Sequence, residues 1–130
     1  MPSPDARAQG QRGEFAAVRK LGGQVVAEGH EAVDVIAPNG TGYQVKAPVY
    51  HRADGSNGVV RVSKPHLDTL QSKFHQAGIV VVLMPSVGTT SATPLSIETV
   101  PISTVRDVVG GRWYPETREY EIPWPRLLDN

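Results

Sequence analysis

The sequence predicts an α/β domain, or a closely related α+β domain, in which helices flank a mixed central β-sheet. Helical and extended patterns follow one another in the order α-β-β-β-(β)-α-β-β-α, as expected for such a layered domain. Residues 79–84 form an unbroken apolar run, which is typical of a strand buried on both faces. The length of 130 residues corresponds to a single domain, residues 1–130, with an adequate core.

The first predicted element is a helix over residues 6–21, preceded by a loose segment at residues 1–5. Phe15, Val18 and Leu21 recur at helical spacing and define an inward stripe. Glu14 borders this stripe. Two consecutive glycines at residues 22–23 end the helix.

A short strand is predicted at residues 24–27, followed by a polar loop at residues 28–31 and a β-hairpin at residues 32–47. The hairpin prediction rests on two β-branched runs around Asn39-Gly40, a strong turn signal.

We expect the hairpin to bring three polar side chains to one face. Folded around Asn39-Gly40, it places Asp34 opposite Lys46 and Ile36 opposite Gln44. Because side chains alternate along a strand, Asp34, Gln44 and Lys46 then share a face. An Asp in so apolar a strand is costly unless it is paired, solvated or bound to a metal.

Beyond the hairpin, residues 48–58 predict a surface loop and residues 59–62 a strand. Ser63 is the expected N-cap of a second helix, with Pro65 in its first turn. Its apolar stripe runs to residue 77, and Gly78 is expected to stop it.

The last third of the chain predicts alternating short elements. Strands are expected at residues 79–84 and 95–100, and a short helix at residues 104–109. Residues 110–130 predict a tail with a late hairpin around the turn at residues 115–118. Two prolines at residues 123–125 are expected to break regular structure there.

Composition excludes several classes of protein. The chain has no cysteine, so disulfides and zinc–thiolate sites are excluded. Its formal net charge of zero argues against a gross electrostatic footprint for DNA. No apolar run approaches the ~20 residues that span a bilayer. The first residues lack the apolar stretch of a signal peptide. We therefore expect a cytoplasmic protein, or one encoded by a phage and made in a host cell, with no membrane partner.

The oxygen-bearing residues of this region form a candidate metal site. Glu14, Asp34, the side-chain oxygen of Gln44 and the carbonyl of Val45 could surround Mg²⁺ or Mn²⁺, which prefer oxygen ligands. Such a metal would acidify a bound water and stabilise charge on a phosphate. Lys46 could orient or deprotonate that water as a neutral amine, or stabilise the transition state as a cation.

Several other residues are candidates for phosphate contact, because basic side chains bind the phosphates of a nucleic-acid backbone. They are Arg12, Arg52, Arg61 and Lys64, with His30 as a further polar contact. Each could also be an ordinary solvated residue, just as Glu14 could be a solvated helix residue and Lys46 an edge-strand lysine. Trp113, Tyr114, Tyr120 and Trp124 could stack on bases, although core or tail packing is the simpler interpretation.

The order of these motifs resembles the PD-(D/E)xK nuclease superfamily. A helix with Glu14 is followed by Asp34 and then by Gln44-Val45-Lys46, where the family has Glu-x-Lys. Within the superfamily, residues 10–108 are most similar to the archaeal-type Holliday junction resolvases. The strand after Asp34, and the helix and late strand that follow, resemble the corresponding segments of those enzymes.

The resemblance implies a restriction-endonuclease-like fold and a Mg²⁺-dependent (or Mn²⁺-dependent) homodimer that nicks opposing strands of a four-way DNA junction. It implies catalytic roles for Glu14, Asp34, Gln44 and Lys46. Two alternatives share the fold: a restriction-type or nicking nuclease that reads sequence, and a catalytically weakened junction-binding protein.

Two departures from the family pattern bear on these alternatives. Gln44 stands where the family has Glu, so one negative charge is missing, and Glu28 or Glu31 could replace it. His30 lies in a loop where family members often have Ser.

Overall fold

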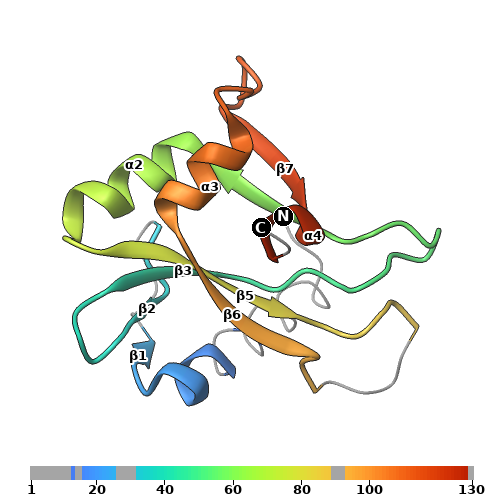
Figure 1. Cartoon of the computed structure of the whole chain (residues 1–130), viewed down its shortest axis with the longest axis horizontal. Helices are drawn as coiled ribbons and strands as arrows, with labels where there is room; N and C mark the ends of the chain where they lie inside the picture. Colours follow the sequence, from blue (N-terminus) through green and yellow to red (C-terminus); the bar gives the residue numbers. More distant parts are fainter. Residues whose placement is uncertain (1–12, 14–15, 26–31, 89–92, 129–130) are drawn as a thin grey trace.

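The computed structural model describes residues 13, 16–25, 32–88 and 93–128. Its centre is a five-stranded sheet in the order β1-β2-β3-β5-β6 (Figure 1). The strands are β1 (Gln24–Val25), β2 (Val35–Ile36), β3 (Gly42–Lys46), β5 (Ala77–Leu83) and β6 (Ser96–Pro101). β3 and β5 run parallel, whereas the other neighbours are antiparallel. The prediction of a mixed sheet flanked by helices is therefore confirmed.

A second layer covers one face of this sheet. It consists of α2 (Lys64–Lys73), α3 (Ile102–Val109), α4 (Trp124–Leu128) and a two-stranded ribbon of β4 (Val59–Ser63) and β7 (Glu119–Pro123). Leu67 and Leu70 of α2 pack with Ile79 and Val81 of β5 in the larger apolar core. Figure 1 shows α2 and α3 together above the sheet, with the ribbon beside them.

The opposite face of the sheet carries a smaller core. Residues 16–21 are helical, and Ala17 packs there with Val35, Val80 and Val82. β5 thus contributes alternate residues to both cores, as its apolar sequence predicts. None of the helices in the described ranges is long and apolar enough to cross a membrane.

The hairpin forms, but the predicted register is wrong by two residues. Ile36 lies opposite Gly42, not Gln44, so Asp34 is not directly opposite Lys46. The turn closes earlier because Gly40 donates its N–H to the Ala37 carbonyl at 2.9 Å. This places Pro38 second in the turn, where a fixed φ is favourable.

The second helix also ends earlier than predicted. Phe74 leaves α2 in an extended conformation with φ −127° and ψ 132°, whereas the stop was expected at Gly78. The Phe74 ring covers Gly42, where an added Cβ would meet the ring at 2.5 Å. Gly78 instead lies inside β5. Ser63 occupies the N-cap position, but its side chain makes no capping hydrogen bond.

The predicted late hairpin and the break at residues 123–125 are both wrong. Tyr114 and Glu119 close only a turn, in which the Tyr114 N–H donates to the Glu119 carbonyl at 3.1 Å. β7 pairs with β4 over five residues, and this pairing takes β4 out of the central sheet. The pairing buries Val60, Val62 and Ile122 in the larger core, which the short predicted hairpin could not do.

Candidate active site

Asp34 lies just before β2, at the point where the strand pairing ends. Its N–H donates to the Tyr43 carbonyl at 2.9 Å, and its carboxylate Oδ2 accepts the Val45 N–H at 2.8 Å. The side chain thus takes the place of a backbone acceptor for a β3 amide. A carboxylate held in this way still has free lone pairs on both oxygens, so it can bind a further group.

Gln44 is the buried polar side chain of this region. It is 7% exposed, and its Oε1 is buried without a hydrogen-bond partner. A buried oxygen left unpaired costs about 1–3 kcal/mol. Val35 pairs with Tyr43 in antiparallel register. Asp34, one residue before Val35, therefore lies opposite Gln44, one residue after Tyr43.

Lys46 ends β3 and is partly buried. Burial lowers the pKa of Lys46 below its ordinary value, because the charged form loses hydration. The charges of Asp34 and Glu119 oppose this by raising the pKa, whereas Arg61 lowers it. Lys46 therefore lies within electrostatic reach of Asp34.

The three side chains share one face of the sheet. Gln44 pairs with Ile79 and Lys46 with Val81, and both of these β5 residues belong to the larger core. Gln44 and Lys46 therefore point toward the layer that contains the β4–β7 ribbon. The register error does not change this result, because a shift of two residues keeps every side chain on its predicted face.

The first helix reaches the same end of β3 from the opposite face. At Gly13 an added Cβ would lie 3.0 Å from the Ala47 Cβ and 3.5 Å from Val45 Cγ1. Five residues named in the sequence analysis fall outside the described residues: Glu14, Arg12, His30 and the alternative carboxylates Glu28 and Glu31. Their participation stays a prediction.

The described residues suit a hard divalent cation. Asp34 offers carboxylate oxygen and Gln44 an orphaned amide oxygen, and such cations choose oxygen ligands. Within residues 13, 16–25, 32–88 and 93–128, no three His, Cys, Asp or Glu side chains cluster as a metal site. The predicted donor set consists of the Asp34 carboxylate, the Gln44 amide oxygen and the Val45 carbonyl. It contains only one residue of these four types, so it does not require such a cluster.

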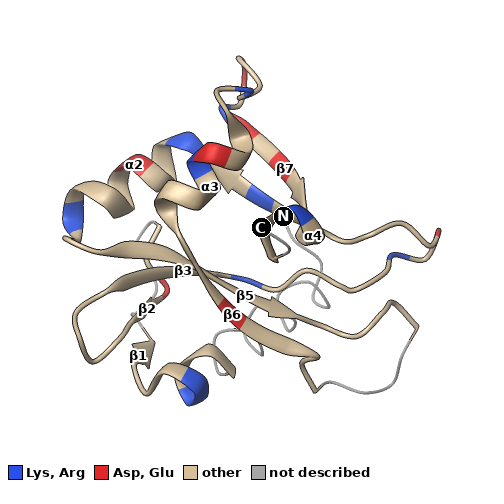
Figure 2. Ribbon diagram, in the orientation of Figure 1, with Lys and Arg blue, Asp and Glu red and all other residues tan. Residues whose placement is uncertain are grey.

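The predicted phosphate-binding cations that the structure describes are all paired with acids. Arg61 contacts Glu121 at 3.4 Å and Glu119 at 4.0 Å, and Arg52 contacts Glu121 at 3.8 Å. Lys64 contacts Asp68 at 3.2 Å. These pairs are exposed, and exposed pairs are weak enough to exchange partners with a phosphate. Figure 2 shows charged positions of both signs over α2, α3 and the β4–β7 ribbon.

Glu119 is the residue near the site that sequence reasoning missed. It lies on β7, contacts Arg61 and raises the pKa of Lys46. Nothing in the local sequence points to it, because it approaches Lys46 only through the pairing of β7 with β4.

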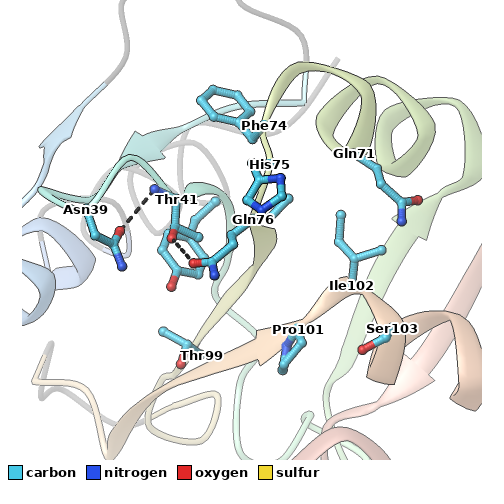
Figure 3. Close-up of a pocket in the computed structure, with 12 residues that line it drawn as sticks. Asn39, Thr41, Gln71, Phe74, His75, Gln76, Thr99, Pro101, Ile102 and Ser103 are labelled. Atoms are coloured by element: carbon cyan, nitrogen blue, oxygen red, sulfur yellow. Dashed lines mark hydrogen bonds between the residues drawn. The ribbon is translucent and has the colours of Figure 1, made fainter.

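A hollow of about 420 Å³ lies at the other end of β3 (Figure 3). Thr41 donates its hydroxyl to Gln76 Oε1 at 3.3 Å, and its N–H donates to Asn39 Oδ1 at 3.0 Å. None of the described residues that line this hollow is Asp, Glu, Lys or Arg. Its lining lacks the carboxylates that a metal needs, so the hollow is separate from the candidate active site at Asp34 and Lys46.

A family model described as a PD-(D/E)XK nuclease superfamily domain matches residues 1–128. No curated protein matches the chain.

Proposed function

The chain belongs to the PD-(D/E)XK nuclease superfamily, and from this premise we propose that it is a Mg²⁺- or Mn²⁺-dependent endodeoxyribonuclease that resolves four-way DNA junctions. Membership supports nuclease activity in general. The metal dependence and the junction substrate are the proposed parts.

One observation carries the metal dependence. Gln44 Oε1 is buried without a partner beside a carboxylate that is fixed but not saturated. A divalent cation would satisfy this oxygen and would balance the charge of Asp34. Without a ligand, the same oxygen only destabilises the fold. If Gln44 is a metal ligand, the bound metal offsets the free-energy cost of burying this oxygen.

Each residue then has a distinct task. Asp34, the Gln44 amide oxygen and the Val45 carbonyl would hold the metal, and Glu14 is expected to complete the set. When bound, the metal would acidify a water and stabilise charge that develops on the phosphate. The Val45 N–H orients the Asp34 carboxylate. Lys46, which lies on the same face of the sheet, would either orient the attacking water or stabilise the phosphate charge.

The surface residues support binding of a DNA backbone. Arg52, Arg61 and Lys64 lie on or beside the β4–β7 ribbon and are exposed or partly exposed. Cations of this kind contact phosphates without reading bases. A junction-selective enzyme needs contacts of this sort, because it recognises the shape of DNA rather than its sequence.

The choice of a four-way junction and of a homodimer rests on resemblance. Residues 10–108 are similar in motif order to the archaeal-type Holliday junction resolvases. A two-fold dimer would place one site on each of two opposing strands. The missing carboxylate at Gln44 favours one alternative, a protein that binds junctions but cuts them weakly.

The test uses an end-labelled synthetic four-way junction beside linear duplexes of the same arms, with Mg²⁺, Mn²⁺ or EDTA. We expect paired nicks near the crossover that disappear with EDTA. Cutting of plain duplex at one sequence would indicate a restriction-type enzyme instead. Tight junction binding without nicks, restored to cutting by Gln44→Glu, would identify the weakened form.

A further inference from the structure

Three aromatic side chains form a partly exposed cluster near the candidate active site. The ring centroids of Tyr50 and Trp124 are 5.1 Å apart with an interplanar angle of 31°, and those of Tyr50 and His51 are 4.4 Å apart at 48°. Tyr50 remains 37% exposed. Trp124 comes from the opposite end of the sequence, so the cluster is created by the fold.

Hydrogen bonds fix this cluster in place. The Trp124 indole Nε1–H donates to the Tyr50 carbonyl at 2.9 Å, and the Trp124 N–H donates to the Gly58 carbonyl at 3.1 Å. The Tyr50 N–H donates to the Met84 carbonyl at 2.8 Å. The aromatic surface is therefore preorganised, and a ligand that binds it loses little free energy in ordering the rings.

The position of the cluster connects it to the site. Tyr50 follows Lys46 by four residues along the continuation of β3, where Val49 still pairs with Met84. Extended chain advances about 3.3 Å per residue, so Tyr50 lies within roughly 13 Å of Lys46. Stacked DNA advances about 3.4 Å per nucleotide along one strand. If a DNA strand places one phosphate at Lys46, a base a few nucleotides further along the same DNA strand therefore lies near Tyr50.

The nearby charge suits the same ligand. Arg52 lies two residues beyond Tyr50; its guanidinium contacts Glu121 at 3.8 Å, and its side chain is 45% exposed. A cation next to an aromatic surface is the combination that binds single-stranded nucleic acid, with phosphates on the cation and bases on the rings. Because the proposed function makes DNA the substrate, the occupant argued for is a nucleic-acid strand, and a protein partner is one outcome of the test below.

We propose that Tyr50, supported by Trp124, is a stacking surface for an unpaired nucleobase of the DNA strand that enters the site. This inference rests on the proposed function and specifies its substrate class: DNA that contains unpaired or unstacked bases near the cut. In a fully paired duplex, the base faces are covered by their neighbours and cannot reach the ring. The cluster would thus select branched or single-stranded regions.

The experiment measures binding in EDTA, so that it does not depend on cleavage. Fluorescence anisotropy compares a labelled oligo(dT) strand, a duplex with a central bulge and the fully paired duplex. Tyr50→Leu should weaken binding of oligo(dT) and of the bulged duplex about tenfold and leave the paired duplex unchanged. Tyr50→Phe, which keeps the ring, should bind like the wild type.

A matched control is offered by Tyr114, which is 53% exposed and lies 6.3 Å from the Tyr120 ring. Tyr114→Leu removes an exposed tyrosine of the same kind and should change no affinity. A second measurement needs no variant at Tyr50. In Trp113→Phe, Trp124 is the remaining tryptophan of the two in the chain, and oligo(dT) should quench its fluorescence.

The inference is overturned if Tyr50→Leu binds oligo(dT) like the wild type, or loses affinity equally for the paired duplex. It is also overturned if the variant changes only the oligomeric state in size-exclusion chromatography, which would indicate a protein contact. Failure of every DNA to bind would instead overturn the proposed function. Normal binding and cutting of DNA by both Tyr50→Leu and the wild type would overturn this inference alone.

Discussion

The carboxylate of Asp34 accepts the backbone N–H of Val45 at 2.8 Å, across the two strands of the hairpin. This bond fixes an acidic oxygen between Gln44 and Lys46 of β3. It also means that the acid has two tasks, one in holding the hairpin and one in the proposed chemistry, and these can be separated by substitution.

Asp34→Asn should abolish function and keep the fold. The amide oxygen of Asn can still accept the Val45 N–H, so the free energy of unfolding should change by no more than about 1 kcal/mol. The loss of the charged ligand should reduce junction cleavage by at least about 100-fold. Urea unfolding and single-turnover cleavage measure the two effects. Asp54→Asn, in an exposed loop, is the charge-matched control and should cleave normally.

Gln44→Glu should change stability in opposite directions with and without metal. In EDTA the variant buries a second carboxylate beside Asp34, and thermal unfolding should occur at a lower temperature than in the wild type. With Mn²⁺ present, the added charge should strengthen metal binding, and the melting temperature should rise above that of the wild type. An exposed counterpart, Gln24→Glu on β1, should show neither effect. A Gln44→Glu variant that is indifferent to Mn²⁺ would contradict the assignment of Gln44 as a ligand.

Stability should depend on pH through Lys46. Burial lowers the pKa of Lys46 below 10.5 in the folded protein, so between the lowered value and 10.5 the unfolded chain binds the proton more tightly. Stability therefore rises with pH across this window. Lys46→Met has no amine to titrate at this position, so the wild type should gain stability relative to this variant as pH approaches 10.5. Urea unfolding in EDTA measures the difference, and a difference that is constant with pH would exclude the effect. Lys73→Met, at an exposed position, is the control.

Glu121→Gln should strengthen DNA binding. Glu121 pairs with both Arg52 and Arg61 and so competes with phosphate for the two cations. Its neutralisation should raise affinity for any duplex about threefold at low salt, and steepen the dependence of affinity on salt concentration. Anisotropy titrations over a salt series measure this. Glu116→Gln makes the same charge change in the exposed turn after α3 and should have a smaller effect. Equal effects would place the DNA elsewhere.

Gly42→Ala should destabilise the protein through Phe74. The new Cβ would meet the Phe74 ring at 2.5 Å, an overlap that costs about 1–3 kcal/mol. Phe74→Leu shortens the side chain, and in this background Gly42→Ala should cost less. A double-mutant cycle by urea unfolding measures the coupling. Additive effects would show that the ring is not the obstacle.

The sequence alone predicts the elements whose signals are local. The apolar run at residues 79–84 predicts β5, and Ser63 with Pro65 predicts where α2 starts. The shared face of Asp34, Gln44 and Lys46 was also predictable although the register was wrong, because strand side chains alternate with a period of two. The register depends on the turn, and the preference of Pro38 for the second position outweighed the signal of Asn39-Gly40.

The remaining features depend on contacts that the local pattern does not contain. The pairing of β4 with β7 joins segments about sixty residues apart, and it alone brings Glu119 toward Lys46. The contact of Tyr50 with Trp124 arises in the same way. The early end of α2 depends on the space above Gly42, which only the packed structure defines.

The β4–β7 pairing also has a consequence for biosynthesis. Val60 and Val62 are made early, but their cover is supplied by Glu119–Pro123. While the ribosome is still adding the residues between, these valines are exposed in the nascent chain and are a target for chaperones. Folding of the larger core must therefore wait until β7 has emerged, so an incomplete polypeptide does not contain the ribbon that faces Lys46.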